Sequence, residues 1–166
     1  MQAVFNREEE MVVGHLKKDT AEIVHLSMPG ALPAGQTLAL NFALGTLSCI
    51  ATSDHLPQLM VQQQFTTSEL SVLLPLLESY PHYCPYEVLY ASFYNGTVTD
   101  LIVARCRQRL QRALELGTWE QELRPLRNVL SRTRIKLRNF GFNVTSILET
   151  GCILMAAPSW KPIAKA

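Results

Sequence analysis

The sequence predicts an α+β fold in which β-strands precede and follow a series of helices. Three observations indicate this class. Short apolar runs, some of them alternating with polar residues, extend as far as residue 64. Apolar residues at helical spacing then continue to residue 138, and two apolar runs around Glu149-Thr150-Gly151 indicate a terminal hairpin. The chain has 166 residues, 48% of them hydrophobic, which is enough to bury a core.

The N-terminal part is expected to form β-strands. Two apolar runs on either side of Lys17-Lys18-Asp19-Thr20 have the pattern of a β-hairpin. After a loop rich in Pro and Gly, polar and apolar residues alternate as they do in a half-buried strand. The strands are expected at residues 11–16, 22–26, 37–42, 46–51 and 58–64. We assign residues 1–43 to an N-terminal β-rich extension.

A capping box indicates the start of the first helix. The Thr66 side chain is placed to accept from the backbone of Glu69, whose carboxylate reaches back to Thr66, and Phe65 precedes them as a hydrophobic staple. The helix is expected to end near Tyr80. Pro75 lies inside it and removes one backbone hydrogen bond, so we expect a kink.

Two further helices are indicated by their ends and by their apolar faces. Pro85 suits the first turn of a helix that directs Leu89 inward and ends by Asn95-Gly96. The next helix is expected from Thr99 to Leu116, where Gly117 stops it. Its apolar face comprises Ile102, Val103, Cys106, Leu110, Ala113 and Leu114.

A fourth helix is expected at residues 123–138, after a connector formed by residues 119–122. Pro125 is tolerated near the helix start, and Asn139 and Gly141 stop the helix.

The C-terminal part is expected to return to β-structure. Residues 142–148 and 152–155 predict the two strands of a hairpin. Residues 156–166 include two prolines and two lysines, and we expect them to form a flexible tail.

The basic residues are concentrated in one part of the chain. Ten of the fifteen Lys and Arg residues lie between Arg105 and Arg138, where only three residues are acidic. The formal net charge of +1 therefore conceals a strongly basic segment. Because each Lys or Arg that neutralises a phosphate releases condensed counterions, such a segment indicates a nucleic-acid-binding surface.

The fourth predicted helix has one apolar and one basic face. Its apolar residues from Leu126 to Leu137 fall within one sector and are expected to face the core. An ordinary solvated face would contain Glu as well as Lys, but no acid occurs between residues 123 and 141. Guanidinium groups pair with guanine or phosphate, and Asn pairs with adenine. We therefore predict that the major groove of DNA is contacted by Arg124, Arg127, Asn128, Ser131, Arg132, Arg134 and Arg138.

One segment of this helix resembles a known family. It reads Leu130-Ser131-Arg132-Thr133-Arg134-Ile135-Lys136-Leu137 and is similar, with Leu126, to the recognition-helix signature V-x-x-x-I-S-R-L-R-x-K-L of the OmpR/PhoB-type winged helix-turn-helix transcription regulators. Residues 65–69 resemble the L-T-x-x-E start of the family's first helix, and residues 144–154 resemble its final hairpin. The resemblance implies a winged helix-turn-helix domain at residues 44–155 and sequence-specific binding of double-stranded DNA.

The resemblance also implies roles for individual residues. Arg132 would be the main base-reading residue, Arg124 and Ser131 would contact phosphates or the groove edge, and Arg134 would contact the DNA backbone. Helix geometry adds Arg127 and Asn128 to this set.

Three features differ from the family. The hairpin has Leu148 and Glu149 where the family's wing has Arg and Gly, which argues against a minor-groove contact by the wing. The helix at residues 99–116 replaces a short loop that contacts RNA polymerase in the family. The alternative partners of this helix are RNA polymerase, another regulator or a second copy of the chain. Residues 1–43 are too few for the family's receiver domain, so phosphorelay control is not implied. Candidate contacts of the inserted helix with the DNA backbone are Arg105, Arg109 and Arg112.

The main alternative is a winged-helix module or adaptor that binds proteins without reading DNA, because a fold alone does not determine function. The inserted helix and the weakly basic wing favour this alternative, whereas the acid-free arginine face favours DNA. RNA binding is less favoured, because aromatic residues are not interleaved with the basic ones.

No motif indicates catalysis, a cofactor or a metal. The sequence lacks a Gly-rich phosphate loop, a GxSxG motif and an HExxH motif, so we do not expect an enzyme. The four cysteines and four histidines have no ligand-like spacing, which favours buried, reduced thiols. No segment is long and apolar enough for a membrane span or a secretory signal, so we expect a cytoplasmic protein.

Overall fold

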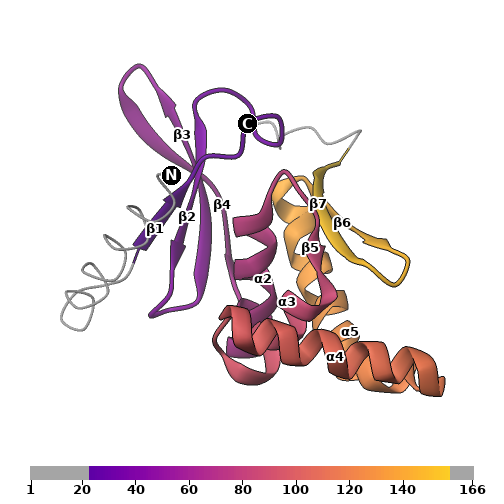
Figure 1. The fold of residues 1–166 in the computed structure, drawn as a ribbon. Helices are drawn as coiled ribbons and strands as arrows, with labels where there is room; N and C mark the ends of the chain where they lie inside the picture. The colour runs from indigo at the N-terminus through magenta and orange to yellow at the C-terminus, as the bar shows by residue number, and fades with distance from the viewer. Residues whose placement is uncertain (1–22, 158–166) are drawn as a thin grey trace. The chain divides into compact units, whose positions relative to one another are not determined.

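The computed structural model describes residues 23–157, and its helices and antiparallel sheets confirm the α+β class (Figure 1). The chain divides into two compact units. Their described parts are residues 23–27 with 35–64, which form a sheet, and residues 28–34 with 65–157, which contain the described helices.

The first unit is a four-stranded antiparallel sheet in the order β1-β2-β3-β4. The strands are β1 (Ile23–Leu26), β2 (Gln36–Asn41), β3 (Thr46–Ser53) and β4 (Leu56–Gln64). The last three confirm the strands expected between residues 37 and 64. Of the expected first hairpin, only β1 is described, and residues 11–16 lie outside the described part. The boundary predicted between residues 43 and 44 falls between β2 and β3. All six residues of β2 pair with residues 46–51 of β3, so this sheet includes strands from both sides of the boundary.

The first described helix of the second unit is α2 (Thr67–Ser79), which starts at the expected capping box. Thr66 Oγ1 accepts from the backbone N–H of Glu69 at 3.2 Å, and Thr66 N donates to Glu69 Oε1 at 3.0 Å. After β5 (Cys84–Pro85) come α3 (Tyr86–Asn95) and α4 (Asp100–Leu116). Both helices end as expected, because Gly96 and Gly117 adopt the left-handed conformation that terminates helices.

The next helix, α5 (Trp119–Leu137), is longer than the sequence predicts. The connector expected at residues 119–122 is in fact its first turn, and Pro125 lies in the helix interior rather than near its start. Tertiary packing accounts for the difference: Trp119 is buried, and its ring meets the edge of Tyr86 with the ring centres 5.8 Å apart. Two glutamates in this first turn also interact favourably with the helix dipole.

The chain ends in a three-stranded antiparallel sheet of order β5-β7-β6. After a short 3-10 helix, η1 (Arg138–Phe140), β6 (Phe142–Ile147) and β7 (Gly151–Ala156) form the expected hairpin. The pairing of β5 with β7 was not predicted, because two residues have no periodicity. Gly151 permits the pairing, since a Cβ atom there would lie 2.1 Å from the Cys84 carbonyl oxygen. Ala156, the first residue of the expected tail, lies in β7, and residues 158–166 are outside the described part.

The core of the second unit is formed by α2, α3, α5 and the terminal hairpin, which contact one another. Its fully buried side chains include Leu73, Leu76, Leu89, Leu123, Leu126, Leu137, Phe140, Phe142 and Leu154. The helix α4 packs on α3 and α5, and its Cys106, Leu110 and Ala113 are buried. One face of α5 is therefore held by the core, which leaves the opposite face outward.

Candidate nucleic-acid interface

The buried face of α5 is the face that the sequence predicts. The expected core residues Leu126, Val129, Leu130, Thr133 and Leu137 are all buried. The Thr133 hydroxyl donates to the Val129 carbonyl oxygen at 2.9 Å, so this polar group has a partner inside the helix. The helix is therefore fixed in rotation about its own axis, and the direction of its outward residues is determined.

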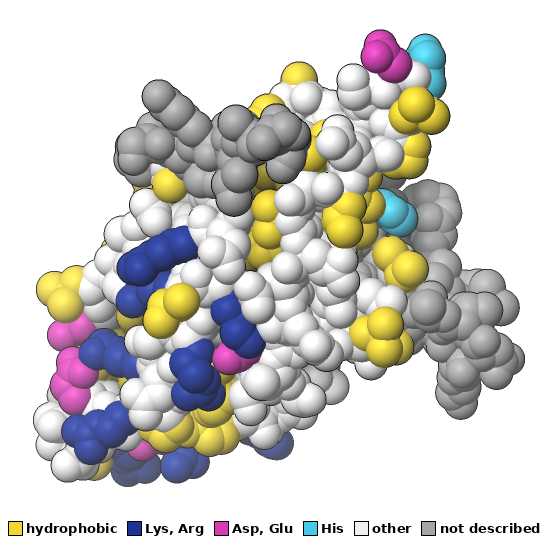
Figure 2. Space-filling view, turned by 180° about the vertical axis from the view of Figure 1, so that it is seen from behind, with side chains coloured by type: hydrophobic (Ala, Val, Ile, Leu, Met, Phe, Trp, Pro, Cys, Tyr) yellow, Lys and Arg dark blue, Asp and Glu magenta, His cyan; other side chains and the backbone are white. Residues whose placement is uncertain are grey.

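The outward face of α5 is basic, but its centre is apolar. Ile135 is 61% exposed, and at about 100° per residue it falls in the middle of the outward sector. Figure 2 shows Lys and Arg side chains gathered on the helical unit, with hydrophobic side chains among them. Arg127 and Arg134 are half-buried, and the other predicted DNA contacts of α5 are exposed: Arg124, Asn128, Ser131, Arg132 and Arg138.

Several of the predicted contacts form ion pairs within the chain. Arg127 Nη1 lies 2.5 Å from Glu120 Oε1, and Arg132 Nε lies 3.4 Å from Glu69 Oε2. The acid-free stretch from residue 123 to 141 therefore does not describe the surroundings of these arginines, because Glu120 precedes the stretch and Glu69 comes from α2. By contrast, four exposed arginines make no ion pair with the described residues: Arg105, Arg112, Arg124 and Arg138.

Glu69 links α2 to α5 and is a residue that the sequence reasoning missed as part of this surface. It is only 2% exposed, and its Oε1 also accepts from Lys136 Nζ at 2.6 Å. Burial alone raises the pKa of Glu69, but hydrogen bonds from Lys136 and the Thr66 backbone, with the positive charges of Lys136 and Arg132, lower it below its usual value. Glu69 is therefore charged at neutral pH and holds Lys136 close to the core.

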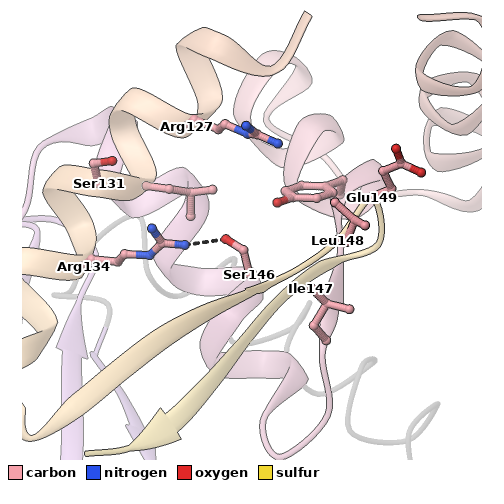
Figure 3. A pocket seen from close by; sticks show the side chains of 9 residues that line it. Arg127, Ser131, Arg134, Ser146, Ile147, Leu148 and Glu149 are labelled. Carbon is pink, nitrogen blue, oxygen red and sulfur yellow. Dashed lines mark hydrogen bonds between the residues drawn. The ribbon is translucent and has the colours of Figure 1, made fainter. Parts of the chain in front are cut away.

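A cleft of about 370 Å³ separates α5 from the terminal hairpin (Figure 3). Arg127, Ser131 and Arg134 line it from α5, and Ser146 lines it from β6. Arg134 Nη2 donates to Ser146 Oγ at 2.6 Å, whereas the buried Arg134 Nε has no hydrogen-bond partner among the described residues. A hydrogen-bond acceptor that entered the cleft could satisfy this donor.

On its other side, α5 adjoins a wider cleft of about 830 Å³ formed with α3 and α4. The three predicted arginines of α4, Arg105, Arg109 and Arg112, all line it. Arg109 Nε lies 2.7 Å from Glu122 Oε2, which also accepts from the Tyr90 hydroxyl. These two hydrogen bonds lower the pKa of Glu122. The structure thus places the α4 arginines beside α5, with one of the three already paired.

The hairpin tip has no basic side chain. No Lys or Arg occurs between residues 139 and 157, Leu148 at the tip is 86% exposed, and Glu149 adopts a φ of 53° in the turn. All Lys and Arg side chains of residues 23–157 therefore lie in α4, α5 and η1.

No protein-family model, curated protein or solved structure matches this chain. Within residues 23–157, no helix is long and apolar enough to cross a membrane. The same residues contain no group of three or more His, Cys, Asp or Glu that could hold a metal ion, and all four cysteines are buried and unpaired.

Proposed function

We propose that this chain is a transcription regulator of the winged helix-turn-helix type that binds double-stranded DNA with α5 in the major groove. The single observation that supports this most strongly is the division of α5 into a buried apolar face and an outward arginine face. The major groove is wide enough to admit an α-helix, and guanidinium groups on such a face can read guanine or contact phosphate there. The order of sheet, capped helix and final hairpin agrees with the family that the sequence resembles.

The ion pairs alter the expected roles of the arginines. Arg124, which has no ion pair among the described residues and is exposed, is the most available cation of α5, together with Arg138 at its end. Arg132 remains the proposed base-reading residue because its side chain is 55% exposed and its contact with Glu69, at 3.4 Å, is long for a hydrogen bond.

The test is a fluorescence-anisotropy titration of a labelled duplex of random sequence at several salt concentrations. Each phosphate contact contributes about 0.9 to the slope of log K against log salt, so the four unpaired arginines predict a slope of roughly 4. Arg124→Gln should reduce the slope by about 0.9. Arg107→Gln is the matched control, because Arg107 of α4 already pairs with Glu87 of α3. A slope near zero in the parent would reject DNA binding.

Two further variants test which arginines contact phosphates and which one reads bases. Replacement of Arg105, Arg109 and Arg112 together by Gln should lower the slope by about two, since two of the three have no internal ion pair. Arg132→Ala should cost about 1 to 3 kcal/mol on a selected sequence and less on random DNA. Equal losses on both kinds of DNA would make Arg132 a phosphate contact rather than a base-reading residue.

A second candidate function is a protein-binding module of the same fold. The exposed Leu148 and the acidic Glu149 at the hairpin tip favour it, because such a tip suits a protein surface better than a phosphate backbone. The same titration separates the two functions. A chain that melts cooperatively but binds no duplex at low salt would support the protein-binding module.

A further inference from the structure

The cleft between α5 and the hairpin brings two guanidinium groups and two hydroxyl groups together. Arg127 and Arg134 are seven residues apart, which places them two turns apart on the same side of α5, and Ser131 lies between them. Ser146 faces them from β6 (Figure 3). The sequence predicts the three α5 residues as contacts of a helix face, whereas no pattern in it indicates a role for Ser146.

Arg134 is the residue that the cleft holds most firmly. Its stem is half-buried, and its Nη2 is fixed by the hydrogen bond to Ser146 Oγ. Its Nε is buried and has no hydrogen-bond partner among the described residues. Since a buried donor without an acceptor is unfavourable, an anion that reaches Nε gains a hydrogen bond that the protein itself does not make.

The cleft is lined by two guanidinium groups and one carboxylate, that of Glu149, so its charge on balance favours an anion with several acceptor oxygens. Arg127 is already paired with Glu120, but its side chain is 40% exposed and that of Glu120 is 68% exposed, and such surface pairs are weak. A phosphate can therefore compete for Arg127. Planar guanidinium groups match the geometry of phosphate oxygens, and the serine hydroxyls supply two further donors.

We infer that this cleft is a phosphate-binding site in which Arg127, Arg134, Ser131 and Ser146 bind the phosphate of an ester. The volume of about 370 Å³ exceeds what one phosphate fills, which leaves room for the attached sugar or alkyl group. The phosphate can come from the DNA backbone, in which case the inference rests on the proposed function, or from a free phosphate ester that binds without DNA. The chemistry of recognition is the same in both cases.

The test follows the Nε–Hε signal of Arg134 by two-dimensional NMR while inorganic phosphate is added at constant ionic strength, with chloride as the balancing anion. We expect a saturable shift of this signal. Ser146→Ala and Arg127→Gln should each weaken phosphate binding about tenfold, the effect of losing one hydrogen bond to a charged group. Ser146 is exposed and Arg127 is half-buried, so both variants should fold, which a thermal melt would verify. Arg107→Gln makes the same change of charge on α4, outside the cleft, and should leave phosphate binding unchanged.

Two results would overturn the site. One is an Arg134 signal that responds to chloride as it does to phosphate, and the other is an Arg107→Gln variant that loses as much affinity as Arg127→Gln. A parallel titration with random duplex DNA identifies the source of the phosphate. Duplex binding with an unresponsive Arg134 signal would reject the site and retain the proposed function. A response to inorganic phosphate without duplex binding would support the site for a free phosphate ester and reject the proposed function.

Discussion

Replacement of Glu69 by Gln should destabilise the second unit and, under the proposed function, strengthen its binding to DNA. Gln has the size of Glu and can still accept the backbone hydrogen bond from Thr66. It has no charge, however, so Lys136 loses its charged acceptor at 2.6 Å and Arg132 loses its only ion-pair partner among the described residues. The same change therefore affects stability through Lys136 and DNA binding through Arg132.

The stability change follows from the contacts and their exposure. A hydrogen bond to a charged group contributes about 1.5 to 3 kcal/mol. The Lys136 side chain is 26% exposed and water can partly solvate it, so we expect the lower part of this range, about 1.5 to 2 kcal/mol. For a unit of roughly 100 residues, this corresponds to a fall in Tm of about 10 °C.

Thermal melts of Glu69→Gln against the parent measure this effect, with Glu115→Gln as the control. Glu115 is an exposed acid of α4, and its replacement should leave Tm nearly unchanged. Because the pKa of Glu69 is lowered in the folded state, its stabilising effect is complete above the unfolded pKa of about 4.3 and is lost as the pH falls through the folded pKa. The difference between parent and variant should therefore be constant at neutral pH and shrink below about pH 4.

The DNA measurement uses the same pair of proteins at a temperature where both are folded. Arg132 without its acid should bind a selected sequence more tightly, and the gain on random duplex should be smaller. An unchanged Tm would refute the ionic link between α2 and α5. A lower Tm with unchanged or weaker binding of the selected sequence would refute the idea that Glu69 competes with DNA for Arg132.

Three further substitutions test the fold and the outward face of α5. Leu130→Asp places a charge at a position that is 2% exposed, which costs several kcal/mol of folding free energy. Near-ultraviolet circular dichroism should therefore show loss of tertiary packing. The control is Asn128→Asp on the outward face, which should melt like the parent. Gly151→Ala sets a Cβ atom 2.1 Å from the Cys84 carbonyl oxygen, so it should separate β5 from β7 and lower Tm. A Tm equal to that of the parent would contradict this clash. Ile135→Ala should change stability by no more than about 0.5 kcal/mol. If the exposed Ile135 contacts thymine methyl groups, the parent but not this variant should prefer thymine over uracil in a selected duplex.

Local signals in the sequence predicted much of the second unit. The capping box at Thr66 and Glu69 lies within four residues, and the glycines that end α3 and α4 act on the helix turns next to them. The inward face of α5 follows from helical periodicity alone, so its buried and outward residues could be assigned before any partner was known.

Features that depend on contacts between residues far apart in the sequence could not be predicted from local patterns. The first turn of α5 could not be predicted because Trp119 is held by Tyr86, more than thirty residues earlier in the chain. The short strand β5 is defined only by its pairing with β7, and Pro125 suggested a helix start that packing places one turn earlier.

By itself, the sequence determined which residues of α5 are apolar and which are cationic, because that division depends only on composition and helical geometry. Only the tertiary structure decided which cations are available to a ligand. Packing of α2 against α5 places the Glu69 carboxylate beside Lys136, 67 residues away, and packing of the hairpin gives Arg134 a hydroxyl partner in Ser146. Coulomb and hydrogen-bond energies depend on distance in space rather than along the chain, so the state of these charges follows from the fold.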